Sequence, residues 1–426
     1  MARVVVVGAG AMGLAAAYHA GRRGHAVTVL EAAPEPGGMA AHLDLAGLSI
    51  ERFYHFVCRA DRPTFDLMSE LGLGDRMRWV PTSMGYYVDG SLHPWGDPVS
   101  LLRFPGLSFV EKLRYGAMMA IETKRRDWRA LDTVSARDWI TRWCGARVYE
   151  RMWAPLFRLK FFQHADTVSA AWIWTRIRRL GTSRRSLFQE ELGYIEGGSQ
   201  TLVDALVAAV ERQGGTVRCG VPVERIDIAE GAVAGVTAGG EVFPADAVIC
   251  TVPTPHVSAL VPAMPAAERA RYDAIENIGV VCVLVRLKRS ITPHFWVNIA
   301  DPRFAIPGIV EFSNLRPTGD TVVYVPYYMP PDRPEFSRDD ATFRAEALGC
   351  LKMLQPALRD EDVVAVKIGR LRHAQPVCPP GFSTMLPPVE TSVRGLQIAD
   401  TAFYYPEDRG IAESVRLGRE MAERVP

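Results

Sequence analysis

The chain has 426 residues, of which 48% are hydrophobic and 23% are charged, values typical of a soluble globular protein with two or three domains. Its 49 Lys and Arg residues almost balance its 48 Asp and Glu residues, which argues against a nucleic-acid-binding protein because such proteins carry a basic excess. Its seven cysteines are scattered and form no CxxC motif, which excludes a zinc ribbon and favours a reducing compartment.

The start of the chain combines a basic residue with an apolar run, as a signal peptide does. Glycines and the polar stretch 18–23 interrupt this run, and no apolar run of about 18 residues occurs anywhere in the chain. We therefore expect a cytoplasmic protein without a transmembrane helix.

A strand, a glycine-rich turn and a helix are predicted next. Residues 3–7 are mostly β-branched and apolar, as in a buried parallel strand, and residues 14–22 and 26–30 predict a helix and a second strand. In such a unit the glycines permit a tight bend, the approach of the backbone to a pyrophosphate, and close packing of helix on strand, while the helix N-terminus stabilises the phosphate charge. The turn predicts a dinucleotide site formed by Gly8, Gly10, Ala11, Met12 and Gly13.

An acidic residue ends the second strand. Glu31 lies 23 residues after Gly8, where a carboxylate accepts hydrogen bonds from an adenosine ribose and repels the 2′-phosphate of NADP. The alternative is a glycine-rich turn in a βαβ unit that binds no nucleotide. The joint presence of strand, turn, helix, strand and acid favours the nucleotide site.

The next glycine pair favours FAD over NAD as the cofactor. Gly37 and Gly38 follow Glu31 by six and seven residues, and this spacing resembles the extended fingerprint of flavoproteins with two dinucleotide-binding domains. The resemblance implies that Ala32 and Met39 also lie along FAD. Many amine oxidases carry Arg where this chain has Met39, so that phosphate contact is replaced or absent.

The far end of the chain extends the resemblance. A predicted strand ends at Asp400, and an amphipathic run follows over 411–425. With these motifs the chain resembles the superfamily of FAD-dependent amine oxidases and protoporphyrinogen oxidases, which also includes phytoene-desaturase-like enzymes and UDP-galactopyranose mutase. The resemblance implies that Asp400 binds the ribityl–pyrophosphate region and that the last helix points its N-terminus at the flavin pyrimidine edge, through Gly410, Ile411 and Ala412. Helix N-terminal amides stabilise the negative charge of a reduced flavin there.

One detail limits this resemblance, and a middle segment of the chain extends it. Asp400 is followed by Thr401 and Ala402 rather than by Gly and Glu, which points away from close kinship with monoamine oxidases. Residues 197–253 resemble the middle FAD segment of the superfamily, in which the residue that matches Val223 holds the adenine through its backbone. Some members link the flavin to a cysteine near the position of Cys378, but we expect FAD to be bound non-covalently and this cysteine to be a small buried residue.

The expected fold is α/β, with a discontinuous Rossmann-like FAD domain over 1–57, 190–255 and 365–426. An α+β substrate domain is inserted twice, over 58–189 and 256–364. Within the insertions the sequence predicts helices over 62–71, 109–126, 135–143, 148–162, 170–180 and 339–354, and strands over 279–287, 295–297 and 321–328.

Catalytic candidates follow the glycine pair. Tyr54 and His55 lie in a stretch that, in related flavoproteins, runs beside the flavin or the substrate. A histidine there can donate to flavin O4 or relay a proton near neutral pH. The alternative for both residues is a packed and satisfied core position.

Substrate-side candidates come from a basic stretch. Residues 151–190 contain eight Lys and Arg residues against two acids, with aromatic residues between them. This stretch predicts an anion site or a membrane surface, and the alternative is a solvated helix face. We expect Arg158, Lys160 and Arg176 to bind an anion, and His373 and Gln375, on a strand that returns to the flavin, to border the pocket. No spacing of His and Cys predicts a metal site.

Three functions remain open at this point. The first is an FAD-dependent oxidoreductase that moves a hydride from a C–N or C–C site of a small molecule to flavin N5, the small molecule being anionic if the basic stretch lines the pocket. The second is a flavoenzyme without net redox change, such as a nucleotide-sugar mutase. The third is a flavin-containing binding protein without turnover. The sequence leaves the oligomeric state undetermined.

Overall fold

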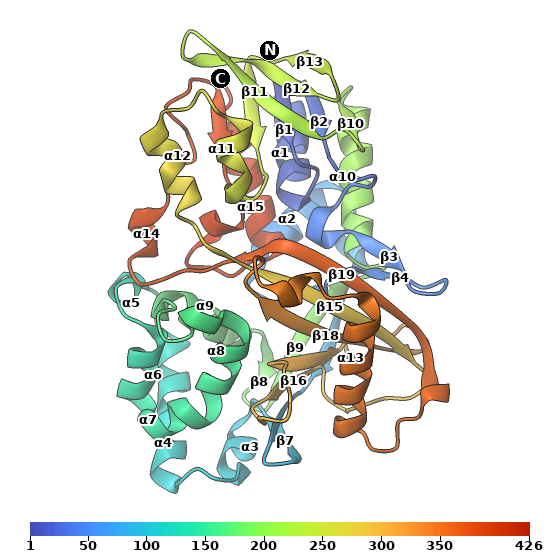
Figure 1. The fold of residues 1–426 in the computed structure, drawn as a ribbon, viewed down its shortest axis with the longest axis vertical. Coiled ribbons are helices and arrows are strands. Elements are labelled where there is room, and N and C mark those ends of the chain that lie inside the picture. Colours follow the sequence, from blue (N-terminus) through green and yellow to red (C-terminus); the bar gives the residue numbers. More distant parts are fainter.

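The computed structural model describes residues 1–426 as two domains stacked along the long axis of the molecule, with both termini in the first domain (Figure 1). A five-stranded parallel sheet, in the order β10-β2-β1-β14-β20, forms the centre of the first domain. Its strands come from three distant parts of the chain, which confirms the discontinuous Rossmann-like fold. They are β1 (Arg3–Val7), β2 (Ala26–Leu30), β10 (Thr216–Arg218), β14 (Ala247–Cys250) and β20 (Leu396–Ile398).

Helices cover one face of this sheet and a small antiparallel sheet covers the other. Both layers bury the apolar side chains of the central strands, because a parallel sheet presents apolar residues on both of its faces. The helices are α1 (Ala11–Arg22), α2 (Arg62–Glu70), α10 (Ser199–Arg212) and α15 (Ile411–Glu423). The second layer holds β11 (Val223–Ala229), β12 (Ala232–Ala238) and β13 (Glu241–Pro244), beside α11 (Val257–Leu260) and α12 (Ala266–Asp273). The short helix α14 (Phe382–Met385) instead buries Phe382 in the core of the helical lobe.

The second domain is built on a seven-stranded sheet in the order β19-β15-β18-β17-β16-β6-β7, with α13 (Asp340–Leu354) packed against it. Its pairs are antiparallel except for β16 and β6, which run parallel. The strands are β6 (Met84–Val88), β7 (Ser91–Trp95), β15 (Asn277–Leu287), β16 (Trp296–Ile299), β17 (Gly308–Glu311), β18 (Thr321–Met329) and β19 (Val363–Pro376). Two smaller sheets link the domains, formed by β3 (His42–Asp44) and β4 (Ser49–Glu51), and by β5 (Met77–Thr82), β8 (Arg184–Ser186) and β9 (Gln189–Ile195).

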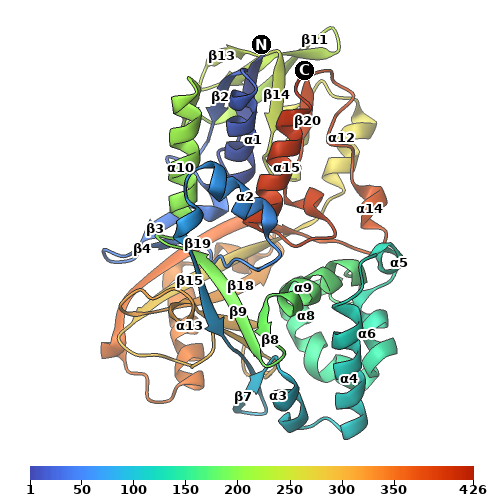
Figure 2. The same cartoon turned by 180° about the vertical axis from the view of Figure 1, so that it is seen from behind.

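A helical lobe completes the second domain, and Figure 2 shows it from behind. Its core buries the tryptophans Trp139, Trp172 and Trp174. Its helices are α3 (Pro98–Arg103), α4 (Phe109–Glu122), α5 (Arg129–Asp132), α6 (Ala136–Cys144), α7 (Ala146–Val148), α8 (Ala154–Phe161) and α9 (Ala170–Thr182). None of the helices in the structure combines the length and the hydropathy that crossing a bilayer requires.

The structure shifts some of the expected boundaries. Residues 365–376 belong to β19, which pairs along its length with β15 in the substrate-domain sheet and not with the FAD-domain sheet. Conversely, α2 and residues 257–273 pack on the cores of the first domain. The helix expected over 148–162 is divided by a π-helical turn at Tyr149–Trp153, because Pro155 at the start of α8 lacks the N–H that would continue the regular ladder.

The crossing of α1 and α15 supplies a test of this packing. A Cβ on Gly418 of α15 would lie 2.4 Å from the carbonyl oxygen of Met12 in α1, whereas a Cβ on Gly349 of α13 would meet no atom within 4 Å. We expect Gly418→Ala to lower the free energy of unfolding by about 1–3 kcal/mol through overpacking. The control Gly349→Ala should raise it by about 0.5–1 kcal/mol, since Ala favours a helix. Urea denaturation compares the two, and a stabilised Gly418→Ala protein would contradict the close crossing.

Candidate active site

The first glycine turn leaves a surface open to a ligand. Gly8 has φ of +101°, and a Cβ on Gly13 would lie 1.9 Å from the carbonyl oxygen of Gly8, so both positions require glycine. A Cβ on Gly10, in contrast, would meet no atom within 4 Å. Gly10 also precedes α1 without a side-chain cap, so the amides of Ala11 and Met12 lack the usual partner. Open backbone beside uncapped amides fits the pyrophosphate of a dinucleotide.

The carboxylate of Glu31 braces this turn. It accepts hydrogen bonds from the backbone N–H groups of Ala9 (2.7 Å) and Ala33 (2.8 Å), and the side chain is half-buried. The carbonyl of Glu31 accepts from the N–H of Val221 at 2.8 Å, which brings the start of β11 at Val223 to the same edge. Because a carboxylate has about four acceptor sites, lone pairs remain for a ribose.

The second glycine pair lies directly on the first turn. The N–H of Gly37 donates to the carbonyl of Ala9 at 2.8 Å, and a Cβ on Gly38 would lie 3.3 Å from the Cα of Gly10. Both glycines have positive φ, +115° and +56°. The structure therefore brings the two glycine motifs together, with Ala32 exposed and Met39 half-buried beside them.

Asp400 fixes the C-terminal part of this region. Its two carboxylate oxygens accept from the N–H groups of Thr254 and Ala402, each at 2.8 Å, and burial raises its pKa to about 6. The last helix begins after Gly410 without a side-chain cap, which leaves the amides of Ile411 and Ala412 to bind negative charge. Residues from three segments thus form a surface that fits FAD.

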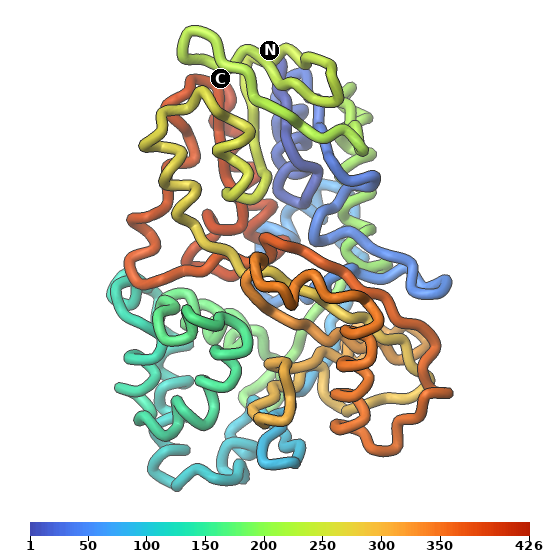
Figure 3. The backbone as a smooth tube through the Cα atoms, in the orientation of Figure 1, coloured from blue at the N-terminus to red at the C-terminus, as the bar shows by residue number.

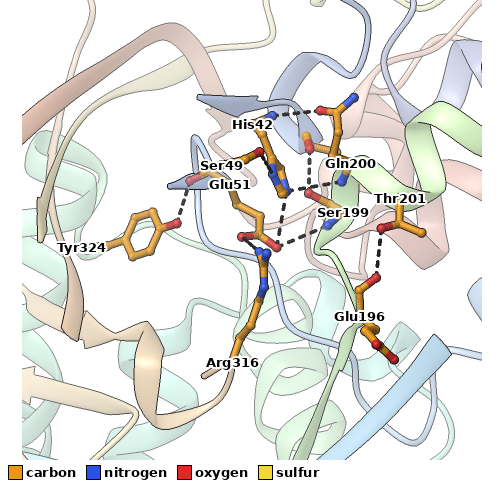
Figure 4. A network of polar contacts seen from close by, with 10 residues as sticks. His42, Ser49, Glu51, Glu196, Ser199, Gln200, Thr201, Arg316 and Tyr324 are labelled. Atoms are coloured by element: carbon orange, nitrogen blue, oxygen red, sulfur yellow. Dashed lines mark hydrogen bonds and ion pairs between the residues drawn. The ribbon is translucent and has the colours of Figure 1, made fainter. Parts of the chain in front are cut away.

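A buried polar network joins this surface to the substrate domain (Figure 4). Glu51, which is 2% exposed, accepts from the N–H of Ser199 (3.2 Å) and from the Arg316 guanidinium (2.7 Å). His42 Nε2 accepts from the N–H of Gln200 at 3.3 Å, so Glu51 and His42 together cap α10, which has no cap of its own. The network thereby ties β3, β4 and the start of α10 to the segment that carries Arg316.

The environment of Glu51 keeps it ionised. Burial acts to raise its pKa, but His42, whose Nε2 lies 3.7 Å from one carboxylate oxygen, and the charge of Arg316 outweigh burial and leave the pKa below its usual value. A Cβ on Gly198 would lie 2.5 Å from both the Glu51 carboxylate and the Arg316 guanidinium, so only glycine fits before α10. The hydroxyl of Tyr324 donates to the Glu51 carbonyl at 2.6 Å and orients the start of the next segment.

Tyr54 and His55 follow within four residues of Glu51. The Tyr54 ring packs edge-on against Trp296 and Tyr324, and its hydroxyl lies 3.5 Å from that of Tyr328. Burial lowers the pKa of His55 to about 4, so its imidazole is neutral at physiological pH. Its buried Nδ1 has no hydrogen-bond partner within the protein. A neutral imidazole with a free ring nitrogen can bind a ligand, and the catalytic role of both residues remains a prediction.

A group of cations surrounds Asp408 on the substrate side. Arg176 donates to Asp408 at 2.8 Å and stacks on Trp172, and Gln375, which is 1% exposed, lies 3.4 Å from the same oxygen. Asp408 and Gln375 line a crevice too narrow to admit a water molecule, together with Trp172, Pro376, Cys378, Thr401, Ala402, Tyr405, Glu407 and Arg409.

Lys160 lies close to this group and has no ion-pair partner. Its ammonium nitrogen sits 5.1 Å from the ring centre of Tyr328 and 5.6 Å from that of Phe161. Burial, and next the charge of Arg176, hold its pKa well below the usual value. An ammonium without a counter-ion is costly in such a place, which makes Lys160 a candidate for binding an anion.

The remaining substrate-side candidates lie apart from Lys160. Arg158 is exposed on the outer face of α8 and pairs with Glu150 at 2.7 Å, so the structure does not bring it to Lys160. His373 packs edge-on against His256, and burial lowers its pKa. The register of β19 against β15 shifts between Leu371 and Gln375, so His373 and Gln375 are not related by the simple alternation of a strand.

Sequence reasoning missed several residues of this region. Asp408 and Arg409 stand in the stretch before the last helix, where the adjacent acid and base gave a weak signal for a site. His42, Glu51 and Arg316 gave none, because their partners lie far away in the sequence.

The Glu51 network makes stability depend on pH with a definite sign. Because the pKa of Glu51 is lowered in the folded state, its contribution is present above about pH 4.5 and is lost as the pH falls through the folded value. We expect Arg316→Ala to cost about 3–5 kcal/mol near neutral pH, since it leaves a buried carboxylate unpaired. The stability gap between the wild type and Glu51→Gln should shrink as the pH falls below about 4.5 in urea denaturation.

Glu311 is the matched control for that experiment. Burial raises its pKa to about 7, which is the opposite shift. Ionisation of Glu311 therefore weakens the fold as the pH rises, and Glu311→Gln should gain stability relative to the wild type above about pH 7. Parallel pH profiles for the Glu51→Gln and Glu311→Gln proteins would contradict the assigned environments.

Comparison with known proteins agrees with this geometry. The family model described as flavin containing amine oxidoreductase matches residues 13–402. The protein AofH of Mycobacterium tuberculosis, named as a flavin-containing monoamine oxidase, is 27% identical over 59% of this chain, and the chain spans 57% of the length of AofH. All-trans-zeta-carotene desaturase of Myxococcus xanthus is 26% identical, over 76% of this chain and 71% of its own length.

Solved structures show the same fold. A structure from Exiguobacterium sp. 255-15, named as a protoporphyrinogen oxidase, superposes with a TM-score of 0.76 at 20% identity, covering 99% of this chain and 98% of the other. Putrescine oxidase bound to putrescine gives a TM-score of 0.73 at 18% identity, covering 99% and 98%. With a family model that matches most of its length, the chain belongs to the flavin-containing amine oxidoreductases, as a flavoenzyme whose cofactor is FAD.

Proposed function

We propose that the protein oxidises a small anionic molecule, taking a hydride from a C–N or C–C site of its substrate. When bound, FAD supplies the hydride acceptor at N5. The observation that carries the proposal is the unpaired side-chain amine of Lys160, which lies beside Tyr328 and near the crevice that Asp408 and Gln375 line. A bound anion would stabilise its charged form.

Backbone amides and one carboxylate of the first domain would bind the cofactor and stabilise its negative charge. Gly10 and the first turn of α1 offer uncapped amides to the pyrophosphate, and Glu31 offers carboxylate lone pairs to the ribose. The uncapped start of α15 places Ile411 and Ala412 where backbone amides stabilise negative charge. Burial raises the pKa of the Cys378 thiol well above its usual value, which supports a non-covalent cofactor because the thiolate is the reactive form.

On the substrate side, charge decides which molecules fit. Lys160, Arg176 and Arg409 act on one carboxylate, that of Asp408, so the group carries an excess of positive charge. Glu407 adds less than a full negative charge, because burial and then the charge of Glu413 raise its pKa to about 7. A substrate carboxylate or phosphate would supply the missing counter-ion of Lys160.

The neutral His55 and the hydroxyl of Tyr54 complete the proposed site. A neutral imidazole with a free Nδ1 accepts or donates one hydrogen bond without adding charge, which suits a group beside a hydride donor. A nucleotide-sugar mutase would also need cations for a diphosphate. None of the relatives described above is named as a mutase, so the oxidoreductase is the better supported function.

Anaerobic reduction of the flavin tests the reaction class. The purified yellow protein is titrated with amines, amino acids, porphyrinogens, polyprenyl compounds and nucleotide sugars while the visible flavin absorption is recorded. We expect loss of this absorption with one class of donor, because hydride transfer reduces the flavin. Turnover of nucleotide sugars only after reduction by dithionite, with no donor that bleaches the flavin, would contradict the proposal and favour the mutase.

A second titration tests the anion site separately. Lys160→Met should raise the concentration of an anionic donor needed for half-reduction by roughly tenfold or more, since a charge-assisted contact contributes about 1.5–3 kcal/mol. The control Arg158→Met removes a cation from the outer face of the same helix and should change the half-reduction concentration by less than about twofold. An unchanged half-reduction concentration together with a shifted pH profile of the reduction rate would assign Lys160 to proton transfer instead of anion binding.

A further inference from the structure

Exposed hydrophobic side chains are concentrated at one place on the molecule. Twelve large hydrophobic residues are exposed in the whole chain, and eight of them come from only two segments, residues 99–121 and 187–188. Single exposed apolar residues are normal on a protein surface, but a contiguous group marks a contact with another apolar phase. The eight residues, which we name the apolar tip, are Val99, Leu102, Phe109, Val110, Leu113, Ile121, Leu187 and Phe188.

Helix α4 supplies half of the apolar tip because it is apolar on two faces. Its inner face buries Tyr115 and Met118 in the core of the helical lobe. Its outer face presents Phe109 (65% exposed) and Leu113 (53% exposed), one turn apart, and continues through two exposed alanines to Ile121. A surface helix of a soluble protein ordinarily turns polar side chains outward, so this outer stripe lacks a partner in the structure.

The other members of the apolar tip lie beside α4. The Lys112 ammonium donates to the carbonyl of Leu102 at 2.7 Å, which fixes α3 against α4. The turn between β8 and β9, with Leu187 and Phe188 at its end, is held to the segment before α3 by Arg184, which donates to the carbonyl of Gly96 at 3.0 Å. Figures 1 and 2 both place α3, α4 and β7 at the end of the molecule opposite the two termini.

Basic residues surround the apolar tip. Residues 91–126 contain six Lys and Arg residues and three acids. Each acid is engaged within the protein: Asp97 caps α3, Glu111 caps α4, and the buried Glu122 pairs with Arg125. The exposed cations are therefore not neutralised by neighbouring carboxylates, and they are Arg103, Arg114, Lys124 and Arg126, with Arg185 beside the turn.

We propose that the apolar tip is a peripheral membrane-binding surface that inserts into the interface of a bilayer containing anionic lipids. An apolar helix face flanked by Lys and Arg is the pattern of helices that lie in the plane of a membrane interface. Anionic headgroups complement the basic rim, and each Lys or Arg near such a surface adds to the attraction. A second copy of the chain is less suitable as the occupant, since a symmetric contact would bring two basic rims together.

Sedimentation with vesicles tests the proposal on the full-length protein with bound FAD. Phosphatidylcholine vesicles with and without phosphatidylglycerol serve as probes. We expect the wild type to sediment with the anionic vesicles and to bind them more weakly at high salt. The Phe109→Ser/Leu113→Ser protein should bind the same vesicles at least roughly tenfold more weakly than the wild type. Val242→Ser/Met353→Ser is the matched control, since it removes two exposed hydrophobic residues from outside the apolar tip. It should bind as the wild type does.

Flavin content and melting temperature confirm that each variant is folded, and both should be unchanged because the substituted side chains are exposed. Equal vesicle binding by the two double variants, or no binding by the wild type, would overturn the proposal. A dimer that the Phe109→Ser/Leu113→Ser protein loses in light scattering would also overturn it and assign the apolar tip to a second copy. Membrane binding by the apolar tip does not depend on the proposed substrate, so a negative vesicle experiment would leave the proposed oxidoreductase function unaffected.

Discussion

The buried ion pair between Glu51 and Arg316 sets the relation between the two domains. A carboxylate that is 2% exposed is stable only if its partners are held in place, because an unpaired buried charge costs several kcal/mol. Its partners come from the start of α10 in the first domain and from the segment after β17 in the second. Forming the pair therefore fixes both domains against the hairpin of β3 and β4 at once.

The candidate site depends on this constraint through chain continuity. The glycine pair at 37–38 precedes the hairpin, and Tyr54 and His55 follow it, so the candidate residues on either side of the hairpin are positioned by the same anchor. The hydrogen bond of Tyr324 to the Glu51 carbonyl adds the central strands of the second sheet to the arrangement. Burial of the imidazole lowers the pKa of His55 to about 4 and outweighs the charge of Glu51, which acts to raise it.

Much of the first domain could be predicted from sequence because its signals are local. A glycine turn, a periodic helix and an acid within about 30 residues specify the βαβ unit, and the family resemblance added Val223 and Asp400. The domain boundary expected at residue 365 falls inside β19, because one strand passes through it and its sheet membership is decided by pairing with β15. The Glu51 network escaped prediction because its partners stand 148 and 265 residues away, where sequence pattern carries no information.

The basic stretch over residues 151–190 contains both candidate site residues and surface residues, and the partners of each cation distinguish the two. Its cations differ in their partners: Arg158 pairs with Glu150, Arg176 with Asp408 and Arg179 with Asp61. Lys160 is half-buried and, like Arg178 and Arg184, forms no ion pair, and it lies on the inner side of the lobe whose outer side carries the apolar tip. The aromatic core between them, with Trp139, Trp172 and Phe161, is densely packed, so the proposed membrane contact of the outer face would leave the proposed anion site around Lys160 undisturbed.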